Sequence, residues 1–534
     1  MKTQKAYLNP VTGHGPFRVN QESRKENILF ISVDMVPREF YQQFEGCVEM
    51  HTPHLDTLKQ NHVVFENAFC SSPLCSPSRA SYLSGHYSYI TVNSERAHDG
   101  QDIHVRQEDI LFPEYLKHSG YHCRHAGKSH VGTHKFMDIF GENDSPWDRW
   151  SPPWFDDDQY INYLKNLGFE RISFEKTLYG QEAAGEGRGN CYGGWVAPQN
   201  GKPFPKEATY PAYLVQKTID ALEARQDAEQ PFYFQLDFFG PHQPFAIPAG
   251  MEKREQELRE IIRLPESYQQ IHDNNFQAPW DEPRVYRMYR KNWGLTDPET
   301  LKSYMIANIL QFELLDEMIG RLFAYLQEQG TYHKTWIFLI ADHGEMNGEM
   351  ALIDKGAYLN PGVIRVPLLI KPPADSEFGQ QSYRIEEPVS LLDLAPTMLE
   401  IAGISTDARM DGVSLLQSLV GAQRPDRKPI LFDIWSHVVP NPSIGMVFTA
   451  SNDKNYMFTF NVVDEIDELY ELENRKSLHN LIAEPEASGI VQEALVKMDE
   501  VLERDPRWIS YSGPFKLTYA ERLPTPFGDQ QHFL

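Results

Sequence analysis

Short apolar runs recur along the chain at wide intervals. Residues 27–34 (NILFISVD) form such a run, and it ends in a carboxylate. Similar runs cover residues 231–237 (PFYFQLD), 335–342 (TWIFLIAD) and 366–371 (VPLLIK). A run that is apolar at successive positions is typical of a strand buried on both faces of a parallel sheet. We therefore predict that these four segments form the core strands.

Longer segments between these runs have apolar residues at helical spacing. Residues 301–329 are the clearest case, and Gly330 follows as a helix stop. Residues 389–402 form a second predicted helix, which contains Pro396 and is closed by Gly403. Strands that alternate with helices indicate an α/β fold, a mostly parallel mixed sheet sandwiched by helices.

Three parts of the chain depart from this pattern. Residues 140–230 and 243–300 are aromatic and polar with weak periodicity, and long irregular segments of this kind are often functional loops. From residue 428 onward short β runs with turn residues come first, an amphipathic helical stretch follows, and no clear element is predicted after residue 504. The β runs and the helix are predicted at residues 429–435, 444–449, 455–461 and 489–504.

The length of the chain and these changes of pattern predict two domains. A chain of 534 residues exceeds the size at which a single core stops growing, roughly 250–300 residues. We predict an N-terminal arm at residues 1–26 and a large catalytic domain at residues 27–427. Residues 428–534 are predicted to form a smaller α+β domain with an antiparallel sheet.

Charge and composition exclude some classes of function. The net charge of −25 disfavours nucleic-acid binding, and it requires any anion site to carry its own cations. No stretch is long and apolar enough to span a bilayer. The first 20 residues lack the apolar centre of a secretory signal, which predicts a cytoplasmic protein, although a secreted protein without its signal would look the same. The odd number of cysteines, five, disfavours a disulfide framework.

One segment, Cys75-Ser76-Pro77-Ser78-Arg79, suggests an anion site. Pro77 can occupy the first turn of a helix, and the residues through Leu83 can continue it. A group at a helix N-terminus lies in a positive field that favours anions. Arg79 would then lie about one turn beyond Cys75 on the same side. By itself, however, a cysteine in such a segment is more often a small buried residue.

Polar clusters also follow several predicted strands. Ligands of open α/β sheets bind beyond the carboxyl ends of the strands. Carboxylates together with an imidazole suit a divalent cation. Any one of these clusters alone is more often a helix cap or a satisfied histidine, but together they point to a site. The clusters are Asp34, Gly127-Lys128-Ser129-His130, Gly240-Pro241-His242-Gln243-Pro244 and Asp342-His343-Gly344-Glu345.

These motifs together resemble the sulfatases, in which the cysteine of a Cys-x-Pro-x-Arg signature is oxidised to Cα-formylglycine. The resemblance covers residues 27–480 and implies the α/β fold of the alkaline-phosphatase-like superfamily. The segment around Asp411-Gly412 (MDGVSLL) is also typical of the family. The companion motifs are Asp34, GKSH with Lys128 and His130, GPHQPF with His242, ADHGE with Asp342 and His343, and DKG with Lys355.

The resemblance implies hydrolysis of a sulfate ester with release of inorganic sulfate and an alcohol. Asp34, Asp342, His343 and the formylglycine at Cys75 would hold one divalent metal ion, with Ca²⁺ expected first and Mn²⁺ second. The implied substrate is a small-molecule or saccharide sulfate ester. The implied protein partners are a separate formylglycine-generating enzyme and further copies of the chain in a homo-oligomer.

The resemblance also implies roles for five side chains around this centre. Arg79 and Lys128 would hold the hydrated formylglycine, and Lys128 and Lys355 would neutralise the sulfate oxygens. His130 would be the base that drives sulfate elimination. His242, alone or with Lys355, would be the acid that protonates the leaving group. General acid–base assistance of this kind typically accelerates a reaction about 10²–10⁴-fold.

Some positions differ from the usual sulfatase pattern. Met35 stands where many sulfatases have a second Asp, and thioether sulfur is a poor ligand for Ca²⁺ or Mg²⁺. His343 stands where many have Asn, which favours Mn²⁺-like ions. The Asp342-His343 pair and Ser129 are similar to the phosphonate monoester hydrolase and choline-sulfatase-like branch. Phosphonate monoesters or phosphate diesters are therefore an alternative substrate class, and an inactive binding protein is a third, less favoured reading.

Overall fold

The structure is a computed structural model of the whole chain. It describes residues 5–7, 17–20, 25–37, 48–88, 105, 109–141, 146–149, 151–180, 190–379, 382, 384–406, 409–421, 428–473 and 479–522.

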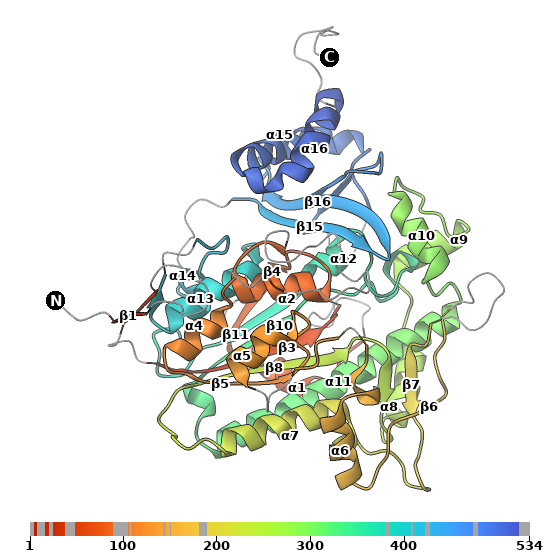
Figure 1. Cartoon of the computed structure of the whole chain (residues 1–534). Coiled ribbons are helices and arrows are strands. Elements are labelled where there is room, and N and C mark those ends of the chain that lie inside the picture. The colour runs from red at the N-terminus through yellow and green to blue at the C-terminus, as the bar shows by residue number, and fades with distance from the viewer. Residues whose placement is uncertain are drawn as a thin grey trace.

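An eight-stranded mixed sheet forms the centre of the large domain (Figure 1). β5, β8, β3 and β10 run parallel to one another, and β11 runs antiparallel to both β10 and β4. This arrangement confirms the predicted mostly parallel mixed sheet. In spatial order the strands are β12 (Arg384–Ile385), β4 (Val63–Phe69), β11 (Arg365–Lys371), β10 (Thr335–Ala341), β3 (Asn27–Asp34), β8 (Phe232–Pro241) and β5 (His122–Gly127), with β13 (Val389–Ser390) paired to β4.

The four apolar runs predicted as core strands are β3, β8, β10 and β11. Two further strands, β4 and β5, escaped prediction because polar residues interrupt their apolar pattern. In β4, Glu66 forms an ion pair with Arg384, and Asn67 accepts a hydrogen bond from Arg365. Partners of this kind let polar side chains lie inside a sheet, and the local sequence does not reveal them.

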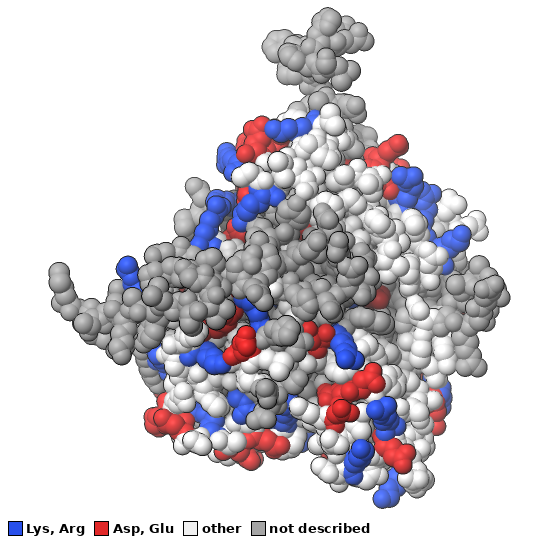
Figure 2. Space-filling view, in the orientation of Figure 1, with Lys and Arg blue, Asp and Glu red and all other residues white. Residues whose placement is uncertain are grey.

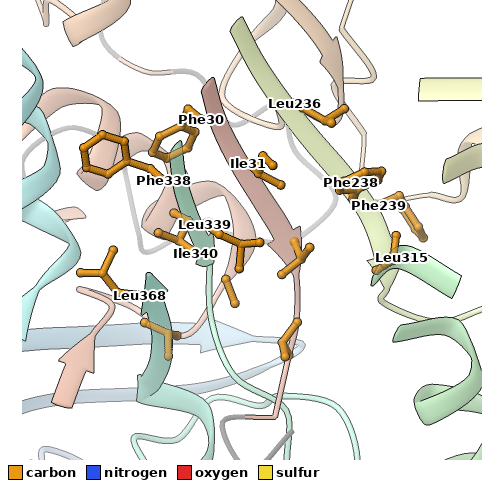
Figure 3. Close-up of a cluster of buried hydrophobic side chains, with 14 of the residues drawn as sticks. Phe30, Ile31, Leu236, Phe238, Phe239, Leu315, Phe338, Leu339, Ile340 and Leu368 are labelled. Carbon is orange, nitrogen blue, oxygen red and sulfur yellow. The ribbon is translucent and has the colours of Figure 1, made fainter. Parts of the chain in front are cut away.

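Apolar side chains from neighbouring strands pack against each other on both faces of the sheet (Figure 3). Phe30 and Ile31 of β3 lie between Leu339 of β10 and Leu236 of β8, and all four are at most 1% exposed. Burial on both faces explains why these strands have continuous apolar runs. This core fixes the ends of β3, β8 and β10, from which the polar clusters extend.

Helices cover both faces of the sheet, as predicted (Figure 1). The predicted helix at 301–329 is α11 (Pro298–Glu328), which begins where the Asp297 carboxylate accepts the Thr300 amide at 2.8 Å. One layer contains α1 (Pro53–Asn61), α7 (Tyr210–Glu223) and α11, and the other contains α2 (Cys75–Ser84), α4 (Phe112–His118) and α13 (Leu394–Ile401).

The second predicted helix, at 389–402, is helical only in its second half. Residues 389–390 form β13, a short 3₁₀ turn follows, and α13 then begins at Leu394. Pro396 therefore lies in the first turn of α13, where no backbone N–H is needed, and does not interrupt a longer helix.

The segments 140–230 and 243–300 contain more regular structure than the sequence predicts. Some of their helices bury few apolar residues, which weakens the periodic signal; α8, for example, buries only Leu258. A small sheet of β6 (Phe174–Glu175), β7 (Gly193–Val196) and β9 (Phe245–Ile247) joins the two segments. The helices are α6 (Asp158–Asn166), α7, α8 (Glu252–Ile261), α9 (Glu266–Asp273) and α10 (Arg284–Asn292).

The C-terminal part is an antiparallel sheet with helices, as predicted. The sheet order is β15 (Ile430–His437), β16 (Val439–Thr449), β17 (Asn455–Asn461) and β18 (Glu468–Glu471), and α15 (Ser488–Arg504) is the expected helix. The expectation of no element after residue 504 is wrong over α16 (Ile509–Arg522), where Phe515 and Tyr511 are buried against α15 and the sheet. Residues 523–534 of the predicted tail lie outside the described residues.

The predicted N-terminal arm contributes to the fold. β1 (Lys5–Tyr7) pairs with β2 (Phe17–Val19), and β2 pairs with β14 (Ile404–Ser405) of the large domain. Phe17 and Val19 are each 3% exposed. Three further helices, α5 (Thr133–Phe140), α12 (Pro361–Ile364) and α14 (Leu416–Leu419), and several 3₁₀ turns complete the described fold. None of the helices in the described part of the chain is both long and apolar enough to cross a membrane.

Candidate active site

Helix α2 begins at Cys75, as the sequence predicts. The Ser78 amide donates to the Leu74 carbonyl at 3.0 Å, and Gly85 ends the helix with a φ of 74°. Every residue of α2 is buried, and its first turn contains no acidic side chain. The Cys75 thiol therefore lies, shielded from solvent, at a helix N-terminus whose partial positive charge favours an anion.

The ends of β3 and β10 bring two carboxylates and an imidazole to this thiol. Because the two strands are parallel neighbours, with Val33 opposite Ala341, Asp34 and Asp342 leave the sheet side by side. The Cys75 Sγ lies 3.6 Å from Asp34 Oδ1 and 3.2 Å from His343 Nε2. One ligand atom from each of the four residues Asp34, Cys75, Asp342 and His343 lies within 4.8 Å of the others, and all four residues are buried.

The chemistry of this donor set fits a divalent cation. The Nδ1 of His343 lies 2.9 Å from the Gly344 carbonyl, which places a proton there and makes Nε2 the ring nitrogen that could bind a metal ion in the cluster. Burial and the neighbouring Asp34 raise the pKa of Asp342, so the two carboxylates repel each other. Two carboxylates and an imidazole are suitable ligands for Ca²⁺ or Mn²⁺.

Two cations balance the charge of these carboxylates. Arg79 Nε lies 2.8 Å from Asp342 Oδ2, and a second nitrogen of its guanidinium lies 3.4 Å from Asp34 Oδ2. Lys128 Nζ contacts the same Asp34 oxygen and lies 3.5 Å from the Cys75 Sγ. Burial alone would raise the pKa of Asp34, but Lys128, His242 and Arg79 hold it well below its usual value. We call Asp34, Arg79, Lys128 and Asp342 the strand-end cluster.

A second group of side chains approaches from two loops. Lys355 Nζ lies 3.0 Å from Asp354 Oδ1 and 3.1 Å from His242 Nε2. The Nδ1 of His242 contacts the Gln243 carbonyl, which fixes the imidazole as a neutral ring with its proton on Nδ1. Burial and Lys355 lower the pKa of His242 to about 3. We call His242, Asp354 and Lys355 the loop trio.

Met35 lies between these two groups. Its φ of 60° is left-handed, and its amide donates to Asp342 Oδ1 at 3.1 Å. Its sulfur lies 3.7 Å from Lys355 Nζ. Where the resemblance expects a second carboxylate, a neutral thioether therefore faces an ammonium group.

The family model for sulfatases matches residues 26–404, and a model described as the C-terminal region of N-sulphoglucosamine sulphohydrolase matches residues 348–504. The chain belongs to the sulfatase family. This confirms the resemblance suggested by the motifs and the expectation of a sulfatase enzyme. The second match overlaps the first and extends over β15–β18 and α15.

Curated relatives resemble this sulfatase over most of its length. It is 24% identical to the uncharacterized sulfatase YidJ of Escherichia coli, with 90% of this chain and 88% of that protein covered. It is 26% identical to the choline-sulfatase of Rhizobium meliloti, with 86% and 83% covered. The phosphonate monoester hydrolase of Silicibacter pomeroyi has a similar fold, with a TM-score of 0.67, 19% identity and coverage of 90% and 96%.

His130 is the remaining predicted catalytic residue, and it belongs to the same sequence motif as Lys128. It lies two residues after Lys128, is 8% exposed and has a φ of 51°. The preceding Ser129 donates to Asp148 Oδ1 at 3.0 Å, and the Ser129 amide donates to the Trp147 carbonyl at 3.1 Å. These contacts fix the backbone on the N-terminal side of His130. Its assignment as the base stays a prediction.

Sequence reasoning missed two carboxylates that support the site. Asp237, in β8, accepts hydrogen bonds from Ser32 at 2.6 Å and from Gln235 at 2.6 Å, and lies 3.9 Å from Arg79. Asp354 belongs to the loop trio. Both had a signal in the sequence, because Asp237 ends a predicted strand as Asp34 does, and Asp354 directly precedes Lys355. Their partners, however, are distant in the chain.

Asp411, which the motifs also singled out, lies outside the strand-end cluster and the loop trio. Asp411 accepts two hydrogen bonds from Arg507, at 2.7 and 2.9 Å, and lies 3.3 Å from His86. These contacts join α2 and the C-terminal helices and do not involve the Cys75 thiol.

The four described cysteines, Cys70, Cys75, Cys123 and Cys191, form no disulfide, and Cys47 lies outside the described residues.

Proposed function

We propose that this sulfatase hydrolyses sulfate esters with a formylglycine formed from Cys75 and one divalent cation held by Asp34, Asp342 and His343. The observation that supports this most is the position of the Cys75 Sγ. It lies at the start of α2, 3.2 Å from His343 Nε2 and 3.5 Å from Lys128 Nζ. A nucleophile at that position would have cationic and metal-ligating groups within reach on several sides.

The donor set supports a cation and a modified cysteine together. Formylglycine supplies a nucleophilic hydroxyl and a second hydroxyl through which sulfate can be expelled, and a bound divalent cation lowers the pKa of the nucleophile and neutralises charge. Ca²⁺ is the first candidate because of the two carboxylates, and Mn²⁺ the second because of His343. The Cys75 thiol is already poised to be an anion: burial and Asp34 raise its pKa, but Lys128, Lys355 and His343 together hold it well below its usual value.

The protein's own cations would hold the sulfate group. The net charge is −25, and acidic and basic side chains are interspersed over the described surface in view (Figure 2). An anionic ester therefore gains attraction only at short range, from Lys128 and Lys355, which are 0% and 3% exposed. In a site shielded from water such charges act strongly and need little reorganisation during the reaction.

The loop trio would supply the proton for the leaving alcohol. His242 is held as a neutral ring that accepts a hydrogen bond from Lys355, so the ammonium group, not the imidazole, carries the available proton. This favours Lys355 as the acid and gives His242 a supporting role. His130 remains the candidate base for sulfate elimination.

A phosphonate monoester hydrolase is the second candidate. Phosphonate monoesters and sulfate monoesters are both tetrahedral monoanions, and the Asp342-His343 pair and the Met35 thioether leave the site with two carboxylates. The expected preference for sulfate esters, the expected homo-oligomer and the expected cytoplasmic location all remain predictions.

Two measurements test the proposal. Mass spectrometry of the Cys75 peptide should show the aldehyde or its hydrate after co-expression with a formylglycine-generating enzyme. The modified protein should then hydrolyse aryl or saccharide sulfates with a higher kcat/KM than aryl phosphonate monoesters, and Cys75→Ala should lower turnover by about 10⁴-fold or more. Equal turnover by wild type and Cys75→Ala would refute the mechanism, and a higher kcat/KM for phosphonates would establish the second candidate.

A further inference from the structure

The loop trio contains one residue with no expected role in the reaction. Asp354 precedes Lys355, has a φ of 63°, and its side chain is 21% exposed. Its Oδ1 accepts both the backbone amide of Lys355, at 2.7 Å, and the Lys355 ammonium, at 3.0 Å. A carboxylate that binds both ends of the next residue restricts the rotamers of that side chain.

The three N–H groups of the Lys355 ammonium have unequal partners. One faces Asp354 Oδ1 at 3.0 Å, and a second faces His242 Nε2 at 3.1 Å. The third neighbour in reach is the Met35 sulfur at 3.7 Å, which is only a weak acceptor. Two donors are therefore engaged with strong acceptors, and the third points towards the residue that follows Asp34 at the cluster of metal-ligating groups.

Asp354 is itself held in place by buried neighbours. Gln243 Nε2 donates to its Oδ2 at 2.7 Å, and its backbone amide donates to the Glu345 carboxylate. The Tyr304 hydroxyl lies 3.5 Å from Gln243 Oε1 and 3.4 Å from Glu345. The loop trio is thus anchored to α11 and to the segment after β10. These contacts hold Asp354, and Asp354 in turn orients the otherwise flexible side chain of Lys355.

We propose that Asp354 is a positioning residue, which fixes the Lys355 ammonium so that its third N–H donates to the ester oxygen that leaves with the alcohol. This inference rests on the proposed function and adds the residue that orients its acid. As the nucleophile at position 75 forms its bond to sulfur, the bond between sulfur and the leaving oxygen breaks, its electron pair stays on that oxygen, and a proton moves to it from Lys355 Nζ. The alcohol departs neutral, and Lys355 remains as an amine until it takes a proton from water.

The charges around Lys355 keep its side chain protonated as an ammonium group. Burial lowers the pKa of Lys355, but Asp354, with Cys75 and Asp34, raises it well above its usual value. Removal of the Asp354 charge would take away the first-named of these raising groups and leave burial opposed only by Cys75 and Asp34, so the ammonium would lose its proton at a lower pH. The titratable and charged groups that interact with Lys355 or its partner Asp354 include Asp34, Cys75, His242, His343, Glu345, Asp354 and His437, together with the hydroxyls of Tyr192, Tyr304 and Tyr358.

Asp354→Asn is a suitable test because it removes charge and preserves shape. Asparagine tolerates a left-handed backbone as well as aspartate does, and its Oδ1 can still accept the Lys355 amide. The Gln243 amide can turn to place its oxygen towards the new NH₂ group. Asp375→Asn, at an exposed position, is the matched control, and urea denaturation of each variant verifies folding.

The decisive measurement is kcat/KM over a series of sulfate esters with increasingly basic leaving groups, from 4-nitrophenol to phenol to an alkyl alcohol. A basic leaving group needs the proton most, so Asp354→Asn should lose about 10-fold with 4-nitrophenyl sulfate and about 10²-fold or more with the alkyl ester. The alkaline limb of its pH–rate profile should move to lower pH. Asp354→Glu, which keeps the charge, should restore part of the alkyl-ester activity, and Asp375→Asn should match the wild type.

A loss in Asp354→Asn that is equal for all leaving groups would overturn the inference, because a structural defect lowers every rate alike. An unchanged alkaline limb would overturn it as well. Both results leave the proposed function intact, since the wild type still hydrolyses sulfate esters. A wild type, converted at Cys75, that turns over no sulfate ester would instead overturn the proposed function and this inference with it.

Discussion

The two sides of the Cys75 thiol are built differently. In the strand-end cluster, the carboxylates lie at the ends of neighbouring core strands, and Arg79 comes from a fully buried helix. In the loop trio, His242 and Lys355 lie on loops that contact each other through side chains. The sheet itself fixes the positions of the strand-end cluster, whereas the arrangement of the loop trio depends on a few hydrogen bonds. We therefore expect changes in the cluster to affect folding and changes in the trio to affect chemistry.

Arg79→Met should give the largest effect on stability. The guanidinium contacts Asp34 and Asp342, is 0% exposed and lies 3.9 Å from Asp237. Its loss leaves buried carboxylates without their partner, which typically costs about 3–5 kcal/mol of unfolding free energy. Urea denaturation in the presence of a chelator measures this, and Arg259→Met, at an exposed ion pair with Glu255, should cost less than about 1 kcal/mol. Equal losses in the two variants would contradict the comparison.

Lys355→Met should lower activity strongly and stability only slightly. We expect kcat to fall by about 10²–10⁴-fold, because the leaving alcohol loses its acid. The loss of unfolding free energy should be much smaller than in Arg79→Met, since the side chain of Asp354 is 21% exposed and can be hydrated. Steady-state kinetics and urea denaturation of the same preparation test both parts. A large loss of stability with normal kcat would reverse the roles assigned to the two sides.

A divalent cation should stabilise the protein through Asp34, Asp342 and His343 and not through the loop trio. A ligand at about 100 times its Kd adds about 2.7 kcal/mol to the free energy of unfolding. Thermal denaturation after chelation, with and without added Ca²⁺ or Mn²⁺, should show a higher Tm with the cation. Lys355→Met should keep this shift and Asp342→Asn should lose most of it. An equal shift in both variants would place the cation elsewhere.

A smaller effect, on stability alone, is expected at Glu468 in β18 of the C-terminal sheet. Its carboxyl group accepts hydrogen bonds from Tyr286 and Tyr470 at 2.6 Å each, and Asn360, after the Lys355 loop, lies 3.4 Å from both hydroxyls. Burial raises the pKa of Glu468 from 4.5 to about 7. Between these pH values the folded state retains a proton that the unfolded state has lost, so stability falls as pH rises through this window.

Glu468→Gln removes this titration and should make the unfolding free energy less dependent on pH. From pH 5 to pH 8 the wild type should lose about 2 kcal/mol relative to the variant. Urea denaturation at several pH values measures the difference. Glu468 is hydrogen-bonded to Tyr286, Tyr470 and Asn461, none of which belongs to the loop trio, so kcat should change little. A wild type that gains stability relative to the variant as pH rises would refute this assignment.

The sequence predicted the parts of the fold whose signal is local. Continuous apolar runs indicated β3, β8, β10 and β11, and helical spacing indicated α11 and α15. β5 was missed because His122, Arg124 and His125 interrupt its pattern, and α16 was missed because Gly513 and Pro514 lie within it. In both elements the stabilising contacts come from distant segments.

In the candidate site, too, the sequence predicted the residues that have a local signal and missed those that depend on distant contacts. The motifs named Asp34, Cys75, Lys128 and Asp342 because each has a recognisable neighbourhood in the chain, and the structure brings them together. Asp237 and Asp354 matter through contacts with Arg79 and Lys355, and these depend on the packing of β8 against β3 and on the path of one loop. The neutral state of His242 likewise depends on a backbone carbonyl and an ammonium group, which no motif specifies.

Asp433 of β15 has a consequence for the timing of biosynthesis. Its amide donates to the Ser71 carbonyl, and its carboxylate accepts the Ser88 hydroxyl, so it braces the chain both before and after α2. Ser88 and Asp433 are 345 residues apart, which a ribosome takes roughly 20–70 seconds to translate. During that interval the segment around Cys75 lacks its final brace. We therefore expect the segment around Cys75 to reach its final packing only after translation has passed Asp433.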